Sequence, residues 1–246
     1  MSVAPVLSVV VPVCNEAENV GPLAREIGAA LAQVPHEILF VDDGSTDATA
    51  AEVRRAREAG IPQLRLLRHS RRSGQSAAVH SGVRAARAEW VATLDGDGQN
   101  DPADIPALLA ARRDALLVMG NRVSRQDTWR RHAQSRIANA VRGTLLRDGT
   151  PDTGCGIKLL HRATFLELPY FDHMHRFLPA LFRRAGAVVV SVPVRHRPRA
   201  RGVSKYGMFD RLWVGIVDIL GVMWLQRRFR PGLSVSEEQG GGDGVG

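Results

Sequence analysis

Cysteine is scarce in this 246-residue chain, which holds only Cys14 and Cys155. Two thiols so far apart in the sequence do not form a disulfide framework, so we expect a protein of the reducing cytoplasm. Long apolar runs are also missing, since no stretch approaches the ~18 consecutive apolar residues that indicate a membrane-spanning helix. The first residues carry no basic n-region, and we therefore expect no signal peptide.

Two glycine-based nucleotide fingerprints are absent as well. No G-x-G-x-x-G follows the first apolar segment, which argues against a dinucleotide-binding fold, and no G-x-x-x-x-G-K-[ST] indicates a P-loop. Positive charge is abundant instead: 33 Lys and Arg against 25 Asp and Glu give a net charge of +8 and a pI of about 10.7. This excess favours an anionic partner, such as nucleic acid, an acidic membrane surface or a phosphate-bearing substrate.

Short apolar runs alternate with amphipathic segments through the first half of the chain. The runs predict strands at Leu7–Val13, Ile38–Val41, Leu64–Leu67, Trp90–Leu94 and Leu116–Met119. Helices are expected between them, among them one from a capping box at Asn15 and Glu18 to Gln33, one capped by Ser45 or Thr46, one over Gln75–Ala88, and one begun by Asp101-Pro102. This alternation predicts βαβ units and an α/β fold with a mainly parallel sheet.

The second half of the chain is less regular. A basic helix is expected at Trp129–Leu146, a turn and strand at Thr153–Leu160, short helices to Ala185, a strand at Ala187–Val194, a basic loop at Arg195–Gly207 and a helix at Phe209–Arg228. No internal repeat and no linker divides the chain. The glycine-rich segment from Ser234 to Gly246 has the composition of a disordered tail.

Polar residues gather where the predicted strands end, at Asn15-Glu16, Asp42-Asp43, Asp95–Gln99 and Asn121-Arg122. Because ligands of parallel α/β sheets bind beyond the carboxyl ends of the strands, these clusters predict one shared site.

Asp95-Gly96-Asp97 and Gln99 give this site its chemistry. The glycine allows a turn that brings both carboxylates to one hard cation, Mg²⁺ or Mn²⁺, which in proteins often also holds a diphosphate. A solvated polar turn is the alternative for the motif taken alone. An EF-hand is disfavoured because Asn100 and Pro106 stand where its glycine and glutamate belong. An aspartyl-phosphate phosphatase is disfavoured because the motif follows a fourth strand and has Gln99 after the second glycine.

Five motifs in order resemble a known family. They are Val11–Glu16 (VPVCNE), Val41–Ser45 (VDDGS), the D-x-D with Gln99, Gly120-Asn121-Arg122, and Arg199–Gly207 (RARGVSKYG). Over residues 6–228 the chain resembles family 2 glycosyltransferases with a GT-A fold, a Rossmann-like three-layer α/β/α architecture, and specifically the dolichol- or polyprenyl-phosphate sugar synthases.

The resemblance implies roles for individual residues. A nucleotide-sugar donor would be bound by Pro12, Cys14, Glu16, Val41, Asp43, Asp95, Gly96, Asp97, Gln99, Arg199 and Lys205. The metal would be held by Asp95, Asp97 and Gln99, with Asp95, Asp97 and Arg122 as the catalytic set. The acceptor phosphate would meet Arg122 and Lys158. Lys158 stands in the run Cys155-Gly156-Ile157-Lys158, where the family carries an arginine, so it keeps the charge but loses the bidentate fork.

The basic loop and the last helix concern partners and location. The arginines of Arg195–Arg201 are not interleaved with aromatic residues, which disfavours nucleic acid and favours a loop closing over phosphates, with Gly202 and Gly207 as hinges. The segment Leu212–Leu225 is apolar except for Asp218, too short to span a membrane, and flanked by tryptophan and arginine. It predicts a helix at a membrane interface, with packing on the domain, on a membrane partner protein or in a homo-oligomer as the alternative.

Together these features predict three segments: a GT-A domain over residues 1–207, an interfacial helix over 208–230 and a disordered tail over 231–246. The function that follows is an inverting transfer of a sugar from a GDP- or UDP-sugar, GDP-mannose for instance, to polyprenyl or dolichyl phosphate. Its place is the inner, cytoplasmic face of the cytoplasmic membrane, where the protein is peripheral. Two alternatives are a family 2 enzyme with a glycan or protein acceptor, and a noncatalytic basic binding domain.

Overall fold

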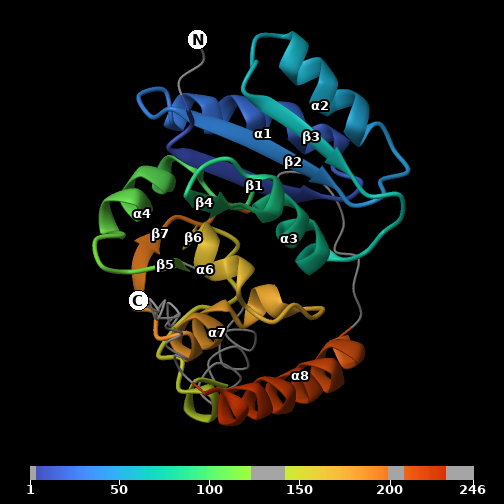
Figure 1. Ribbon diagram of the computed structural model, residues 1–246. Coiled ribbons are helices and arrows are strands. Elements are labelled where there is room, and N and C mark those ends of the chain that lie inside the picture. The colour runs from blue at the N-terminus through green and yellow to red at the C-terminus, as the bar shows by residue number, and fades with distance from the viewer. Residues whose placement is uncertain (1–3, 123–141, 199–207, 231–246) are drawn as a thin grey trace, which may run out of the picture.

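The computed structural model describes residues 4–122, 142–198 and 208–230, the last of these with side chains from residue 215 onward. One seven-stranded sheet forms its centre (Figure 1). The strands are β1 (Leu7–Val13), β2 (His36–Asp42), β3 (Leu64–Arg68), β4 (Trp90–Thr93), β5 (Leu117–Arg122), β6 (Lys158–His161) and β7 (Val189–Val194). Their order across the sheet is β3-β2-β1-β4-β6-β5-β7.

All neighbouring strands are parallel except around β6, which runs antiparallel to β4 and β5. The predicted mainly parallel sheet is therefore confirmed. Insertion of β6 separates β4, which leads into Asp95, from β5, which ends at Arg122. Thr93 of β4 pairs with Lys158 of β6, and Met119 of β5 pairs with the same lysine.

Helices cover both faces of the sheet (Figure 1). Alternate residues of β1 show how: Val9 and Val11 enter the core beneath α1 (Ala17–Ala30), α2 (Thr49–Glu58) and α4 (Ile105–Ala111), which follows the 3₁₀ turn η1 (Pro102–Asp104). Val10 faces the second core, under α3 (Gln75–Ala85), α6 (Arg162–Leu166), α7 (Leu178–Arg184) and α8 (Met208–Arg228). This is the three-layer α/β/α architecture that the sequence predicts.

The expected helix caps at Asn15 and Ser45 are wrong. Helix α1 begins at Ala17, and its cap residue Glu16 makes no side-chain capping bond. Asn15 instead has a left-handed φ of 55° and accepts the backbone N–H of Thr46 at 2.8 Å. Helix α2 begins only at Thr49, whose N–H is accepted by Asp47. Local capping thus gives way to contacts between two loops that are distant in sequence.

The second half agrees more closely with its expected pattern. Asp101 caps η1 by accepting the N–H of Ala103, with Pro102 following it, as predicted. The expected helix at Trp129–Leu146 lies mostly outside the described residues, and its described end, residues 142–146, is helical. Helix α8 packs on α7, with Val222 fully buried in the second core. Among the helices that the structure describes, none is long and apolar enough to cross a membrane.

Candidate active site

The loops that follow β1 and β2 are joined by hydrogen bonds between their polar residues. Besides the Asn15–Thr46 bond, the backbone N–H of Asn15 donates to Ser45 Oγ at 2.9 Å, and that of Glu16 donates to Thr49 Oγ1 at 2.9 Å. These bonds hold the segment after Pro12 against the Asp42–Ser45 turn. The predicted residues Cys14 and Glu16 thus lie at the same sheet edge as Asp43, both partly exposed.

Asp43 is buried and heavily hydrogen-bonded. Its carboxylate accepts the backbone N–H groups of Ser73 and Gly74, each at 2.8 Å, and lies 2.7 Å from Nδ1 of His69. Asp43 therefore shapes the segment between β3 and α3 that forms one wall of the site. Its neighbour Asp42 pairs with Arg68 at 3.1 Å and accepts the N–H of Ser45. The side chain of Val41 is fully buried in the core beside Gly82, so only its backbone can line a donor pocket.

The Asp95–Asn100 turn follows β4 after Leu94. Two glycines leave no room for a side chain beside this turn: Gly96 within it and Gly156 in the segment before β6. A Cβ on Gly96 would lie 2.8 Å from the carbonyl oxygen of Pro12, and a Cβ on Gly156 would lie 2.1 Å from Oδ2 of Asp95. Backbone from β1 and from the turn before β6 thus closes on the motif from two sides. Within it, the N–H of Gln99 donates to Oδ1 of Asp97 at 3.1 Å.

Asp95 is held by a residue that the sequence did not single out. Nε2 of Gln75, the first residue of α3, donates to Oδ1 of Asp95 at 2.8 Å. Burial raises the pKa of the Asp95 carboxyl, the charge of Lys158 opposes this, and the charge of Asp97 raises it further. A carboxylate whose charge is disfavoured by burial and by a second carboxylate is stabilised by a cation bound between them.

The residues present fit Mg²⁺ or Mn²⁺. Asp95, Asp97 and Gln99 offer oxygen ligands, which both ions prefer. Within the described residues, no group of three or more His, Cys, Asp or Glu side chains is arranged to hold a metal by itself. A site that supplies one or two carboxylates and leaves the other positions to water and substrate phosphates is the usual arrangement for Mg²⁺.

Arg122, at the end of β5, is engaged by Asp152. Its Nε and Nη2 donate to the two carboxylate oxygens of Asp152 at 2.6 and 2.7 Å, and both side chains are nearly buried. Burial lowers the pKa of Arg122, but the bond and charge of Asp152 outweigh it and raise the pKa. Arg122 is thus a permanently charged, rigidly oriented guanidinium beside the site, and its charge acts to lower the pKa of Asp95.

Lys158, at the start of β6, is buried, with 5% of its surface exposed, and donates to the carbonyl oxygen of Cys155. Burial lowers the pKa of its amine, while the charges of Cys155 and Asp95 oppose that shift. The sequence assigns Lys158 to the acceptor phosphate. The structure places it beneath the site, beside Asp95.

The basic loop begins along the acidic turn. Residues Asn100 and His196 form a β-bridge, and the N–H of Arg197 donates to the carbonyl oxygen of Gln99. Arg195 pairs with Asp101 and Asp104, and Arg197 pairs with Asp101 and Glu26. These two arginines anchor the loop to the domain. The predicted phosphate contacts Arg199 and Lys205, and the hinges Gly202 and Gly207, lie outside the described residues.

Four strand ends and the two segments 69–75 and 152–158 therefore meet at one site. Sequence reasoning found the strand-end residues because strand ends can be read from hydrophobic patterns. It gave no role of their own to Gln75, Asp152 and Gly156, although the last two lie in the segment that carries the predicted acceptor residue Lys158. The sequence indicated Gln75 only as the first residue of a predicted helix.

Comparison with known proteins then identifies the family. The family model "Glycosyl transferase family 2" matches residues 8–168. The chain belongs to glycosyl transferase family 2. The match spans β1 to α6 and includes the acidic turn, Arg122 and Lys158, so the resemblance inferred from the motifs is confirmed.

Curated relatives of this family 2 member include two kinds of polyprenyl-phosphate enzyme. It is 39% identical over 236 residues to dodecaprenyl-phosphate galacturonate synthase of Rhizobium johnstonii, covering 92% of this chain and 69% of the relative. It is 34% identical over 205 residues to undecaprenyl-phosphate 4-deoxy-4-formamido-L-arabinose transferase of Sodalis glossinidius, covering 82% of this chain. The match spans 63% of the length of that second relative.

Solved structures support the fold. Glucosyl-3-phosphoglycerate synthase from Mycobacterium tuberculosis, in complex with Mn²⁺, UDP and phosphoglyceric acid, superposes with a TM-score of 0.70 at 16% identity. The match covers 92% of this chain and 80% of that one. Its complex with Mn²⁺, UDP-glucose and phosphoglyceric acid gives a TM-score of 0.69. The predicted GT-A fold is thereby confirmed.

Proposed function

We propose that this family 2 member transfers a sugar from a nucleoside diphosphate sugar to polyprenyl phosphate, with Mg²⁺ or Mn²⁺ held by Asp95, Asp97 and Gln99. The observation that carries the proposal is the Asp95–Gln99 turn at the end of β4, enclosed by Gly156 and by the backbone of Pro12. The acceptor class rests on the names of the two relatives given above, and the donor base, GDP or UDP, is left to experiment.

The donor's nucleoside would lie between the β1 and β2 loops, over Pro12, Cys14, Glu16 and Asp43. Its diphosphate would then reach the acidic turn. A bound divalent cation would neutralise the charge that develops on the leaving diphosphate. Gln75 and Lys158 contribute from the protein side, because they keep Asp95 oriented and partly neutralised.

The acceptor phosphate needs no strong general base. A phosphomonoester with a second pKa near ~6 is already largely dianionic at neutral pH. Its oxygen can attack the anomeric carbon opposite the leaving diphosphate, which inverts the configuration there. Arg122 is the better placed of the two predicted acceptor contacts because it is less deeply buried than Lys158, even though Asp152 already occupies its Nε–Nη2 edge. The burial of Lys158 favours its role beside Asp95 over a direct phosphate contact.

A transfer assay tests this proposal. The protein is incubated with Mn²⁺ or Mg²⁺, a panel of labelled UDP- and GDP-sugars, and undecaprenyl phosphate, and the lipid-linked product is extracted and its anomeric configuration determined. Asp97→Asn keeps the size of the side chain but removes one metal-binding charge, so product is expected to vanish. Asp114→Asn, an exposed change beyond α4, is the matched control. Transfer only to a glycan or protein acceptor would overturn the lipid assignment, and no metal-dependent nucleotide binding would overturn the enzyme assignment.

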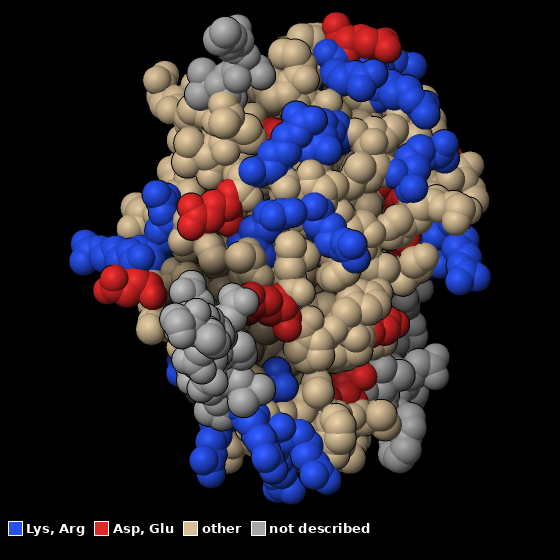
Figure 2. Space-filling model, in the orientation of Figure 1, with Lys and Arg blue, Asp and Glu red and all other residues tan. Residues whose placement is uncertain are grey.

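Helix α8 supplies a surface for the membrane part of the proposal. Ile216, Val217, Leu220 and Trp224 are exposed by 43%, 51%, 59% and 58%. Asp218, the acidic residue in the part of α8 whose side chains are described, turns inward to pair with His173. Arg227 and Arg228 lie in the last turn, and Figure 2 shows Lys and Arg gathered at the lower end of the molecule, where Figure 1 places α8.

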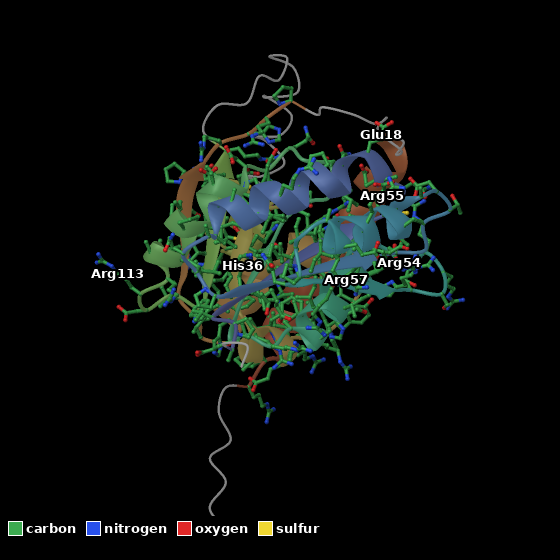
Figure 3. All side chains as sticks on the ribbon, turned by 90° about the horizontal axis from the view of Figure 1, so that it is seen from above. Glu18, His36, Arg54, Arg55, Arg57 and Arg113 are labelled. Carbon is green, nitrogen blue, oxygen red and sulfur yellow. The ribbon has the colours of Figure 1, made fainter. Side chains whose placement is uncertain are left out.

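Other Lys and Arg side chains lie over the rest of the visible face (Figure 2). Arg54, Arg55 and Arg57 of α2 lie on one side of the molecule and Arg113 on the opposite side (Figure 3). An apolar stripe with arginines at its end suits peripheral binding to an anionic membrane, at the cytoplasmic face in this proposal. Flotation with vesicles containing phosphatidylglycerol is the test. Binding should be lost in Leu220→Ser/Trp224→Ser and kept in Val6→Ser, an exposed apolar residue before β1. Equal binding by all three proteins would contradict it.

A further inference from the structure

Two histidines around the 3₁₀ turn η2 (Met174–Arg176) reach in different directions. His173 has a left-handed φ of 64°, and its Nδ1 lies 3.2 Å from Oδ2 of Asp218 on α8. His175 turns toward the start of α3, where its Nδ1 lies 2.7 Å from Oγ of Ser76. The turn η2 is thus fixed to α8 by one histidine and to α3 by the other.

The contact between His175 and Ser76 is buried and is accompanied by a second one. Ser76 Oγ also accepts the backbone N–H of His175, at 3.4 Å. Burial holds the pKa of His175 well below its usual 6.5, and the charges of Lys158, Arg176 and His173 lower it further. Ser76 itself is 1% exposed, so the bond is shielded from water.

The first turn of α3, where Ser76 sits, carries contacts to both halves of the site. Gln75 donates to Asp95 at 2.8 Å, and the N–H of Gly74 donates to Asp43 at 2.8 Å. A shift of this turn therefore displaces the carboxylate assigned to the metal and the carboxylate on the nucleoside side together.

We propose that His175 is a positioning residue for the donor site. It fixes the first turn of α3 through Ser76, and this turn holds Asp95 through Gln75 and Asp43 through Gly74. The proposal deepens the function proposed above and rests on it. A purely structural histidine would affect folding stability alone, whereas this one sets the affinity for the metal–nucleotide pair.

The test compares three substitutions at two histidines. His175→Leu removes the hydrogen-bond partner of Ser76, whereas His175→Asn places an amide group, which can donate or accept, near the position of Nδ1. His36→Leu is the matched control: His36 also bonds through Nδ1, at 2.8 Å to the carbonyl oxygen of Val34, but lies at the opposite end of β2 from Asp42. Ser76→Ala removes the same bond from the other side and serves if His175→Leu does not fold.

Two measurements are made on each protein: calorimetric affinity for UDP and GDP in the presence of Mn²⁺, and hydrogen exchange of the α3 amides without ligand. We expect His175→Leu and Ser76→Ala to weaken Mn²⁺–nucleotide binding by about 10-fold, the effect of one buried hydrogen bond. Exchange in the first turn of α3 should become faster in both. His175→Asn should restore both readouts, and His36→Leu should change neither.

The outcomes separate the two proposals. Unchanged exchange in His175→Leu would overturn the positioning of α3. Faster exchange with unchanged nucleotide affinity would overturn the role in the donor site. If the wild-type protein binds no Mn²⁺–nucleotide at all, the proposed function fails, and the donor-site role of His175 fails with it, while the exchange result still reports on α3.

Discussion

Gly156 offers the sharpest test of the site geometry, because a single methyl group there would overlap the carboxylate of Asp95. A Cβ at Gly156 would lie 2.1 Å from Oδ2 and 2.4 Å from Cγ of Asp95, and 2.5 Å from Oδ1 of Asn100, all below the 3.0 Å that real Cβ atoms keep. In Gly156→Ala, therefore, the Asp95 carboxylate must retreat by about 1 Å, which breaks its 2.8 Å bond from Gln75. A misplacement of about 1 Å in an active site costs up to ~100-fold in rate.

We therefore expect Gly156→Ala to lower kcat/KM for sugar transfer by about 100-fold, or about 2.7 kcal/mol of transition-state stabilisation. Overpacking should also lower the free energy of unfolding by about 1–3 kcal/mol, measured by urea denaturation. Gly28→Ala, a glycine of α1 whose Cβ would meet nothing closer than 4.0 Å, should leave activity intact and raise stability by up to ~1 kcal/mol. Wild-type activity and Mn²⁺ affinity in Gly156→Ala would refute the geometry described for the turn.

Three further predictions concern buried charges. Asp152→Asn breaks the buried pair with Arg122 and should lower the free energy of unfolding by about 3–5 kcal/mol. The double variant Arg122→Met/Asp152→Leu should recover much of the stability but none of the activity. Equal denaturation midpoints for Asp152→Asn and wild type would contradict this prediction. Lys158→Met removes the buried cation near Asp95, so Mn²⁺ should bind a few-fold tighter, by about 1 kcal/mol. The KM for polyprenyl phosphate should stay unchanged, and a large rise in that KM would instead indicate that Lys158 contacts the acceptor phosphate. Burial raises the pKa of Glu37, but hydrogen bonds from Ser8, the Arg87 N–H and Arg65 outweigh burial and lower the pKa. The stability that Glu37 contributes is therefore present above the usual pKa of 4.5 and is lost as the pH falls through the lowered value. Glu37→Gln should flatten this part of the acid-unfolding curve, and an unaltered curve would argue against a stabilising role for the Glu37 carboxylate.

Strands β1, β2 and β4 were predictable from the sequence because each is a largely buried apolar run followed by polar residues. The boundaries of β1 agree with the prediction residue for residue, those of β2 and β3 extend it, and β5 is shifted, since Leu117–Arg122 begins one residue later than predicted and ends beyond Met119. Helix starts were less predictable, as Asn15 shows. An asparagine before a helical pattern reads as a cap, but this side chain finds its partner in Thr46, 31 positions along the chain. Only the meeting of two loops decides between these bonds.

The basic loop illustrates the same limit for charge. In the sequence, Arg195 and Arg197 belong to the arginine-rich run Arg195–Arg201, which reads as a phosphate-binding loop. In the structure they are paired with Asp101, Asp104 and Glu26. Opposite charges that are far apart in sequence neutralise one another only once the fold has brought them together, so a run of arginines does not itself reveal its partners.

The sequence alone determined the α/β class, the edge of the sheet where the candidate site lies and the acidic turn Asp95-Gly96-Asp97, because each depends on a local pattern of apolar and polar residues. Tertiary structure decided what surrounds that turn. The antiparallel β6 brings Lys158 beneath Asp95, Gly156 closes on the carboxylate, and Gln75 and His175 reach it through α3. These contacts join segments up to 99 residues apart, and no local pattern encodes which of them will meet.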